Sequence, residues 1–227
     1  MSHHEGFHRP SVSAILDYRD QRLTASDLYR FLERRQTLLR TQVDVATFLH
    51  WIPAEIQQLW PDAFFLLVVR HPCRWACSYL GMLHSVGQHL HGTADATDMG
   101  WVERYGRHQA PSLNPCHLDQ TFASADATQQ LIRELIDFWS ERHRSVCATI
   151  RRNRLMVTSL DDLASNLPRL ACRAGLSRQH LQPLQQLNTN PTDPRLQQWL
   201  HEQADRARGQ CSSIGGALDL YEQLTAS

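Results

Sequence analysis

The sequence contains no lysine, because all 23 of its basic residues are arginine. That absence excludes the lysine of a phosphate-binding P-loop, a Schiff-base lysine and a lysine acting as general acid. Arginine is matched by 23 acidic residues, for a formal net charge of zero over 227 residues. A neutral chain gives no reason to expect a nucleic acid as partner.

Long apolar runs and paired cysteine motifs are also missing. No run approaches the length of a membrane span, and Met1 to Glu5 is too polar for a signal peptide. The six cysteines form no C-x-x-C motif, which is typical of free, mostly buried thiols in a reducing compartment. We therefore expect a cytoplasmic protein without a membrane partner. These cysteines are Cys73, Cys77, Cys116, Cys147, Cys172 and Cys211.

The most informative stretch is Pro61 to Leu80. It contains a continuous apolar run from Ala63 to Val69, the pattern of a central parallel strand covered by helices on both faces. Pro72 removes a backbone donor and biases His71 away from helix, so the strand ends there and a helical pattern follows. Arg70 stands at the C-terminal tip of this strand, beside the start of a helix. Open α/β sheets bind anionic ligands at that place.

A buried strand followed by Arg70, Pro72 and a helical Ser78 resembles the 3′-phosphate-binding segment of one enzyme family. That family is the sulfotransferases that use 3′-phosphoadenosine 5′-phosphosulfate (PAPS). The resemblance implies that Arg70 and Ser78 grip the 3′-phosphate, and a guanidinium fork with one directed hydroxyl suits that task. The alternative is a strand-end arginine in a surface ion pair and a serine that caps the helix.

Gly6 to Leu16 resembles a modified form of the family's 5′-phosphosulfate loop, G-x-x-R-S-G-T-S-x-L. The resemblance implies that Arg9 stabilises the bridging and sulfuryl oxygens. It also implies that the backbone of Ser11 to Ser13 holds the 5′-phosphate at a helix N-terminus, although Pro10 removes one donor. In the family the loop follows a buried strand, and only MSHHE precedes it here. We therefore expect the first strand to be truncated or to lie upstream.

Val43 to Leu59 is similar to the family's V-D-K-T-P segment and the helix after it, with Val45 and Ala46 in place of lysine and threonine. Asp44 and His50 are the titratable groups left nearby. Each is a candidate base for the acceptor hydroxyl. The alternative is that Asp44 caps a helix and His50 lies on a helix face.

The remaining segments follow the same order as in the family. We expect Leu16 to Gln42 to be helical, with a helix N-terminus at Ser26 and Asp27. The arginines of this region are expected on a solvated face, namely Arg30, Arg34, Arg35 and Arg40. A long amphipathic helix is expected over Ser124 to Arg152. His84 to Phe122 is expected to be a long polar loop, either a plain surface loop or a cover for the acceptor. Arg154 to Thr158 reads as a second buried strand. In the helical part that follows, Arg206 and Arg208 resemble a late basic loop that reaches the 3′-phosphate.

The resemblance is clearest over residues 43–80, extends roughly over 6–170, and leaves 171–227 as a helical C-terminal part. It implies one domain over residues 1–227 with a three-layer α/β fold, P-loop-like, in which helices flank a small parallel sheet. The function it implies is transfer of a sulfuryl group from PAPS to a hydroxyl or amine of a small-molecule or glycan acceptor, with no metal.

The sequence leaves a second interpretation open. A catalytically impaired sulfotransferase-fold protein would act as a nucleotide-binding or interaction module. The short first strand, Pro10 in the loop and the missing lysines favour it. Loss of a single transition-state donor typically lowers a rate by ~10²–10³.

Overall fold

The computed structural model describes residues 2–4, 8–40, 43–93, 103–175, 193–209 and 212–226. Contacts divide the chain into two compact units. Unit 1 comprises Met1–Ala63 and Arg144–Arg154, and unit 2 comprises Phe64–His143 and Leu155–Ser227. A single domain over residues 1–227 stays a prediction.

Unit 1 contains a pair of short parallel strands. β1 (Ser2–His4) pairs with β2 (Val43–Val45), with Ser2 opposite Val43 and His4 opposite Val45. A strand therefore does precede the predicted phosphosulfate loop, and it is three residues long. The carboxyl ends of both strands meet at the same edge, as in any parallel pair.

Helices connect and follow the strands of unit 1. α1 (His8–Arg19) and α2 (Ala25–Leu39) lie between β1 and β2 in the chain. The 3-10 helix η1 (Thr47–Trp51) and α3 (Pro53–Leu59) come after β2. α1 packs against both α2 and η1. The core of this unit includes Val12, Ile15, Leu16, Leu28, Leu32 and Phe48, all buried.

The region predicted to be helical over residues 16–42 contains the end of α1 and the whole of α2. Helix α2 begins after Thr24, which serves as its N-cap in place of the expected start at Ser26. The Thr24 hydroxyl accepts a hydrogen bond from the Asp27 N–H at 3.2 Å, and the Asp27 carboxylate accepts one from the Thr24 N–H at 3.3 Å. This reciprocal capping box satisfies two backbone donors that a helix start otherwise leaves unpaired.

Unit 2 is built on a second parallel pair. β3 (Phe65–Val69) pairs with β4 (Leu155–Ser159), with Phe65 opposite Leu155 and Val69 opposite Ser159. Both strands begin and end within two residues of the runs that predicted them. Each of the two sheets has a parallel pair of strands, and the predicted α/β class with a small parallel sheet flanked by helices is confirmed.

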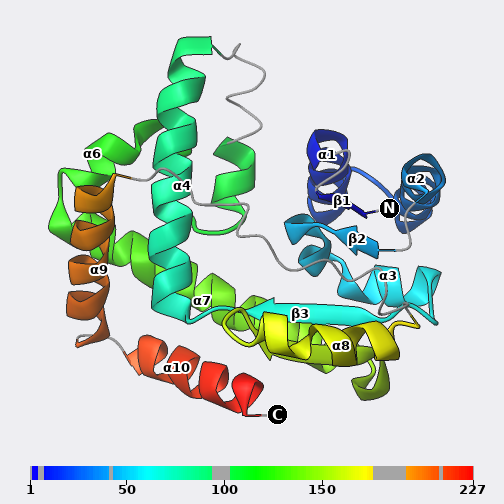
Figure 1. Cartoon of the computed structure of the whole chain (residues 1–227). Coiled ribbons are helices and arrows are strands. Elements are labelled where there is room, and N and C mark those ends of the chain that lie inside the picture. The colour runs from blue at the N-terminus through cyan, green and yellow to red at the C-terminus, as the bar shows by residue number, and fades with distance from the viewer. Residues whose placement is uncertain are drawn as a thin grey trace. The chain divides into compact units, whose positions relative to one another are not determined.

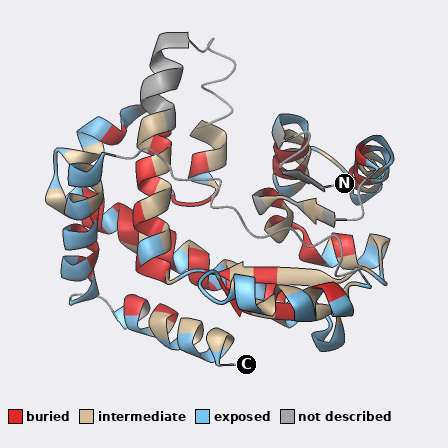
Figure 2. Ribbon diagram, viewed as in Figure 1, coloured by how far each residue is buried: buried red, intermediate tan, exposed pale blue. Residues whose placement is uncertain are grey.

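Helices surround the β3–β4 pair of unit 2 (Figure 1). α8 (Leu163–Arg173) packs against β4, and α10 (Ser212–Thr225) packs against both strands. α4 (Pro72–Thr93) follows β3 and packs along α9 (Pro194–Arg208). Its buried residues include Cys73, Ala76, Cys77 and Leu80. Figure 2 shows buried stretches, in red, along the ribbon of this helix.

The long helix predicted over residues 124–152 is confirmed as α7 (Ala125–Thr149), which the boundary between the units divides at His143. The long polar loop predicted over His84–Phe122 is wrong in part. α4 continues to Thr93, residues 103–107 are helical, and η2 (Pro115–His117) and α6 (Leu118–Phe122) complete the segment. In the described part of the chain, no helix has the length and apolar character that a membrane crossing requires.

Candidate functional site

The N-terminal candidates lie on α1, close to where β1 ends. Arg9 is in the first turn of α1 and is exposed, and Pro10 follows it in the same turn. First-turn N–H groups point out of the end of a helix, where the dipole favours an anion. Gly6, the start of the predicted loop, lies outside the described residues. The structure thus has helix α1 from His8 onward where a loop was expected from Gly6 to Leu16.

Ser11 and Ser13 are helical residues. Both follow Pro10 inside α1, so their backbone N–H groups fall beyond the first turn, where the helix's own hydrogen bonds use them. Ser11 is 0% exposed, and in the described part of the chain its hydroxyl has no hydrogen-bond partner. Ser13 is half-buried. A buried hydroxyl without a partner calls for a physical explanation, such as a bound group or a water.

Asp44, one of the two candidate bases, is engaged in an ion pair. Arg35 of α2 donates from Nη1 to Oδ2 of Asp44, and from Nη2 to Oδ1 at 3.0 Å. The Arg35 side chain is only 4% exposed, and its guanidinium carbon lies 5.4 Å from the centre of the Phe48 ring. The Asp44 carboxylate thus serves mainly to neutralise a buried cation.

His50, the other candidate base, lies in η1 and is half-buried. Its ring stands nearly edge-on to Trp51, with ring centres 5.4 Å apart and an interplanar angle of 79°. Because η1 follows β2 and α1 follows β1, His50 and Arg9 both come after the carboxyl ends of the paired strands. Unit 1 therefore brings Arg9, Ser11, Ser13, Asp44 and His50 into one small structure.

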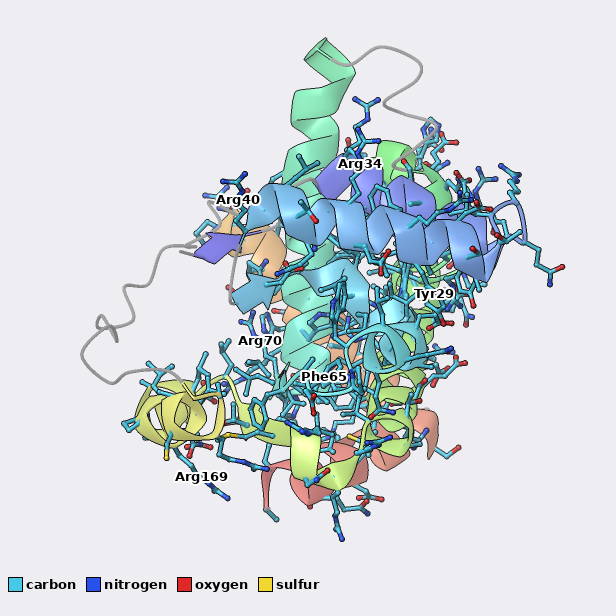
Figure 3. The ribbon with its side chains drawn as sticks, turned by 90° about the vertical axis from the view of Figure 1, so that its right-hand side faces the viewer. Tyr29, Arg34, Arg40, Phe65, Arg70 and Arg169 are labelled. Atoms are coloured by element: carbon cyan, nitrogen blue, oxygen red, sulfur yellow. The ribbon has the colours of Figure 1, made fainter. Side chains whose placement is uncertain are left out.

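Arg70 and Ser78 belong to unit 2, at the junction between β3 and α4. Arg70 follows Val69 directly and is exposed at the carboxyl end of β3, where Figure 3 labels it. Ser78 is half-buried in α4. The expected strand, turn and helix around these two residues are present, with Pro72 as the first residue of α4. Proline is favoured in the first turn because its fixed φ suits a helix and its missing N–H is not needed there.

Arg74 also lies at this junction, although sequence reasoning did not select it. Arg74 and Ser78 are four residues apart, so they lie one above the other on the same face of α4. Arg74 is exposed, and its charge acts on His71 together with that of Arg208 in the last turn of α9. Burial first, and then the fields of these two arginines, lower the pKa of His71 from its ordinary value.

The face of α4 directed toward α9 carries thiols that stay protonated. Cys73 and Cys77 are buried and free. Burial raises the pKa of Cys73 and raises that of Cys77 to about 12. A thiol with a raised pKa is a poor nucleophile and a poor metal ligand at neutral pH. Among the described residues, no group of three or more histidines, cysteines or carboxylates is placed to hold a metal ion.

Sequence reasoning missed the role of Arg35, which it placed with Arg30, Arg34 and Arg40 on a solvated face. Arg34 and Arg40 are exposed, as Figure 3 shows, whereas Arg35 is buried. The signal was available in the spacing, because the buried residues of α2 are Leu28, Leu32, Arg35 and Leu39. Residues three and four apart share one helix face, so position 35 belongs to the apolar stripe.

Comparison with known proteins gives one match. No curated protein and no solved structure matches the chain. A family model described as a sulfotransferase domain matches residues 8–165, from the first residue of α1 into α8. The match includes Arg9, Asp44, His50, Arg70 and Ser78, and it covers more than half of the 227 residues. The chain therefore belongs to the sulfotransferase domain family.

Proposed function

We propose that the protein transfers a sulfuryl group from PAPS to a hydroxyl or amine of a small-molecule or glycan acceptor. The observation that carries the proposal is the sulfotransferase domain match over residues 8–165. Two anion-suited places in the structure support it, namely the N-terminal turn of α1 and the β3–α4 junction. Both follow the carboxyl end of a parallel strand, where α/β proteins bind anionic ligands.

The reaction is an in-line displacement at sulfur. The acceptor oxygen or nitrogen forms a bond to sulfur while the bond from sulfur to the bridging oxygen breaks. The 3′,5′-bisphosphate nucleotide leaves with that oxygen, and the acceptor proton passes to a base. Like phosphoryl transfer, this chemistry needs positioning and cationic stabilisation more than covalent help.

We assign the sulfuryl and 5′-phosphate end of the donor to the N-terminal turn of α1. Arg9 stabilises the bridging oxygen, on which negative charge develops as the bond breaks. The N–H groups of the first turn of α1 face the 5′-phosphate, because the Ser11 to Ser13 backbone lies beyond that turn. The unsatisfied Ser11 hydroxyl and the half-buried Ser13 remain candidate side-chain donors.

We assign the 3′-phosphate to Arg70 and Ser78 at the β3–α4 junction. In the described part of the chain, Arg70 makes no hydrogen bond or ion pair, so its guanidinium is available to a phosphate. Arginine presents parallel N–H donors that match two phosphate oxygens at once. Ser78 adds one directed hydroxyl.

His50 is the favoured base. The Asp44 carboxylate already accepts from both terminal nitrogens of Arg35, and its loss would leave that cation buried. Both oxygens of this carboxylate are thus engaged in a structural contact. An imidazole, by contrast, changes protonation near neutral pH without a large cost.

A nucleotide-binding or interaction module is the second candidate. The engaged Asp44 and the placement of Pro10 in the first turn of α1 favour it, since each removes a group that catalysis could use. Such a module would bind the nucleotide without turning it over. Its partner would then be recognised by a surface other than the donor site.

The free thiols Cys73 and Cys77 support a reducing, cytoplasmic location for either function.

The test is sulfuryl transfer from radiolabelled PAPS to a panel of phenols, alcohols, amines and glycans. Arg9→Ala should lower the rate about 10²–10³-fold, as loss of one transition-state donor does. Arg34→Ala is the matched control, because Arg34 is an exposed arginine on α2. Binding of the nucleotide product without any transfer would favour the module, and equal rates for Arg9→Ala and Arg34→Ala would overturn the role of Arg9.

A further inference from the structure

Three arginines, one after the end of β3, one in α4 and one at the end of α9, lie near enough to the β3–α4 junction for their charges to act on its titratable groups. Arg70 follows β3, Arg74 lies in α4, and Arg208 ends α9. The charges of Arg74 and Arg208 both reach His71, and that of Arg70 reaches Cys77 on the same helix. In the part of the chain that the structure describes, none of the three arginines makes a hydrogen bond or ion pair.

A gathering of unpaired cations is unfavourable unless something offsets it. The carboxylate of Asp205, one turn before Arg208 on α9, acts on Cys73 and Cys77. Among the described residues whose charges act on His71, Cys73 and Cys77, one carboxylate thus stands against three guanidinium groups. The remaining positive potential attracts anions and favours those that carry two charges. The cluster therefore has the electrostatic character of a site for a dianion.

His71 lies within this cluster and has an unused ring nitrogen. It is half-buried, and in the described structure its Nδ1 is buried without a hydrogen-bond partner. The ring of Tyr221 from α10 holds it by an edge contact, with ring centres 5.5 Å apart and an interplanar angle of 64°. A buried ring nitrogen without a partner is expensive, so a ligand that pairs with the imidazole gains binding energy.

We propose that His71 is a further ligand of the anion bound at this junction, and that it holds the anion in its protonated form. The inference rests on the proposed function, in which the anion is the 3′-phosphate of PAPS. Arg70, Arg74 and Arg208 supply fixed charge, and His71 supplies a charge that appears when the ligand arrives. Nucleotide binding then takes up a proton.

The sign of the effect follows from linkage. In the free protein, burial and the neighbouring arginines disfavour the imidazolium, so His71 is neutral near pH 7. A bound dianion offsets the arginine charges and favours protonation. By reciprocity, any condition that protonates His71 strengthens anion binding, so affinity rises as the pH falls.

The experiment is calorimetric titration with 3′-phosphoadenosine 5′-phosphate between pH 8 and pH 6, for the wild type and for His71→Gln. The nucleotide phosphates themselves titrate with a pKa of about 6, so the difference between the two proteins is the readout. We expect wild-type affinity to gain roughly fivefold to tenfold more than the variant over this range, which is within the tenfold per pH unit that one linked proton allows. Tyr221→Phe keeps the ring contact and should keep the wild-type profile.

Sulfate is the second probe, because it stays doubly ionised over the whole range. Sulfate binding that strengthens at low pH only when His71 is present would uphold the anion site. If the nucleotide did not bind under the same conditions, the anion bound at this site would not be the 3′-phosphate of PAPS. Equal pH profiles for wild type and His71→Gln with both probes would overturn the inference while leaving the proposed function standing. If His71→Gln fails to fold, NMR titration of His71 in the wild type tests the inference instead. The pKa of His71 must then rise when either probe binds.

Discussion

Arg35 and Asp44 join helix α2 to strand β2 through a two-pronged ion pair, with Nη2 and Oδ1 3.0 Å apart. The arginine is the more deeply buried partner, at 4% exposed against 21% for the aspartate. The pair thus places a carboxylate of the family motif in a structural role. The two roles considered for Asp44 can be told apart by substitution. Loss of a catalytic base lowers kcat, whereas loss of a buried counter-ion lowers the free energy of unfolding.

Asp44→Ala should lower the free energy of unfolding by about 3 kcal/mol, the lower part of the range for breaking a buried pair, because Asp44 is partly exposed. The cause is the guanidinium of Arg35 left buried without its anion. Denaturant unfolding measures the change. Adding Arg35→Leu to the variant should restore part of the loss, since it removes the buried cation. A loss below about 1 kcal/mol, the level of a surface pair, would contradict this account.

His50→Ala should lower kcat about 10²–10⁴-fold, the contribution typical of a general base, while leaving the affinity for the nucleotide product unchanged. Asp44→Asn, which keeps the size of the side chain, should lower stability more than it lowers kcat. Steady-state kinetics with an acceptor from the transfer panel, combined with product titration, separates the two. If Asp44→Asn lowered kcat more than His50→Ala did, Asp44 would be the base.

His143 should make the protein less stable in acid. It is 1% exposed on α7, and its Nδ1 donates to the Trp139 carbonyl at 2.6 Å. Burial and then the charge of Arg142 lower the pKa of His143 from 6.5 to about 3. Between these values the unfolded chain binds a proton that the folded chain does not. The contribution of His143 to the free energy of unfolding is therefore complete above pH 6.5. Below that pH the free energy of unfolding falls by up to about 1.4 kcal/mol per pH unit.

Thermal melts from pH 7.5 to pH 4 measure this slope. His143→Leu should flatten it relative to the wild type. His201→Leu is the matched control, because His201 makes the same contact to a carbonyl four residues earlier, at 2.6 Å, but is exposed. If both variants keep the wild-type slope, burial of His143 is not the cause.

Thr24→Ala should destabilise unit 1 by about 1 kcal/mol, the usual cost of losing an N-cap side chain. The substitution removes the capping box with Asp27 at the start of α2. Thr37→Ala serves as the control, since Thr37 is an exposed residue inside the same helix whose hydroxyl only reaches back to the Glu33 carbonyl. Equal effects in denaturant unfolding would show that the cap does not stabilise the helix.

The strands and the junction around Arg70 could be predicted because strong local signals coincide there. The run from Ala63 to Val69 is too apolar for a surface strand, and Pro72 fixes where it ends. Where the signal is a single polar side chain, prediction failed. Thr24, not Ser26, caps α2, since the reciprocal bond with Asp27 requires a spacing of three residues. Ser26 lies too near Asp27 for that.

The burial of Arg35 and the gathering of Arg74 with Arg208 depend on distant parts of the chain. Arg35 is buried because β2 brings Asp44 to it, and composition alone makes an arginine a surface residue. Arg74 and Arg208 are 134 positions apart and meet at His71 only because α9 packs along α4. Local pattern carries no information about such contacts.

The most direct test of the central claim is calorimetric titration with 3′-phosphoadenosine 5′-phosphate of the wild type, Arg70→Ala and Arg169→Ala. Arg169 is an exposed arginine of α8, labelled in Figure 3, and gives a matched loss of charge in unit 2. We expect the wild type and Arg169→Ala to bind the nucleotide, and Arg70→Ala to lose about tenfold to 100-fold in affinity, as for one charged hydrogen-bonding group. Equal affinity in all three proteins, or no binding by the wild type, would contradict the assignment of a PAPS site at the β3–α4 junction.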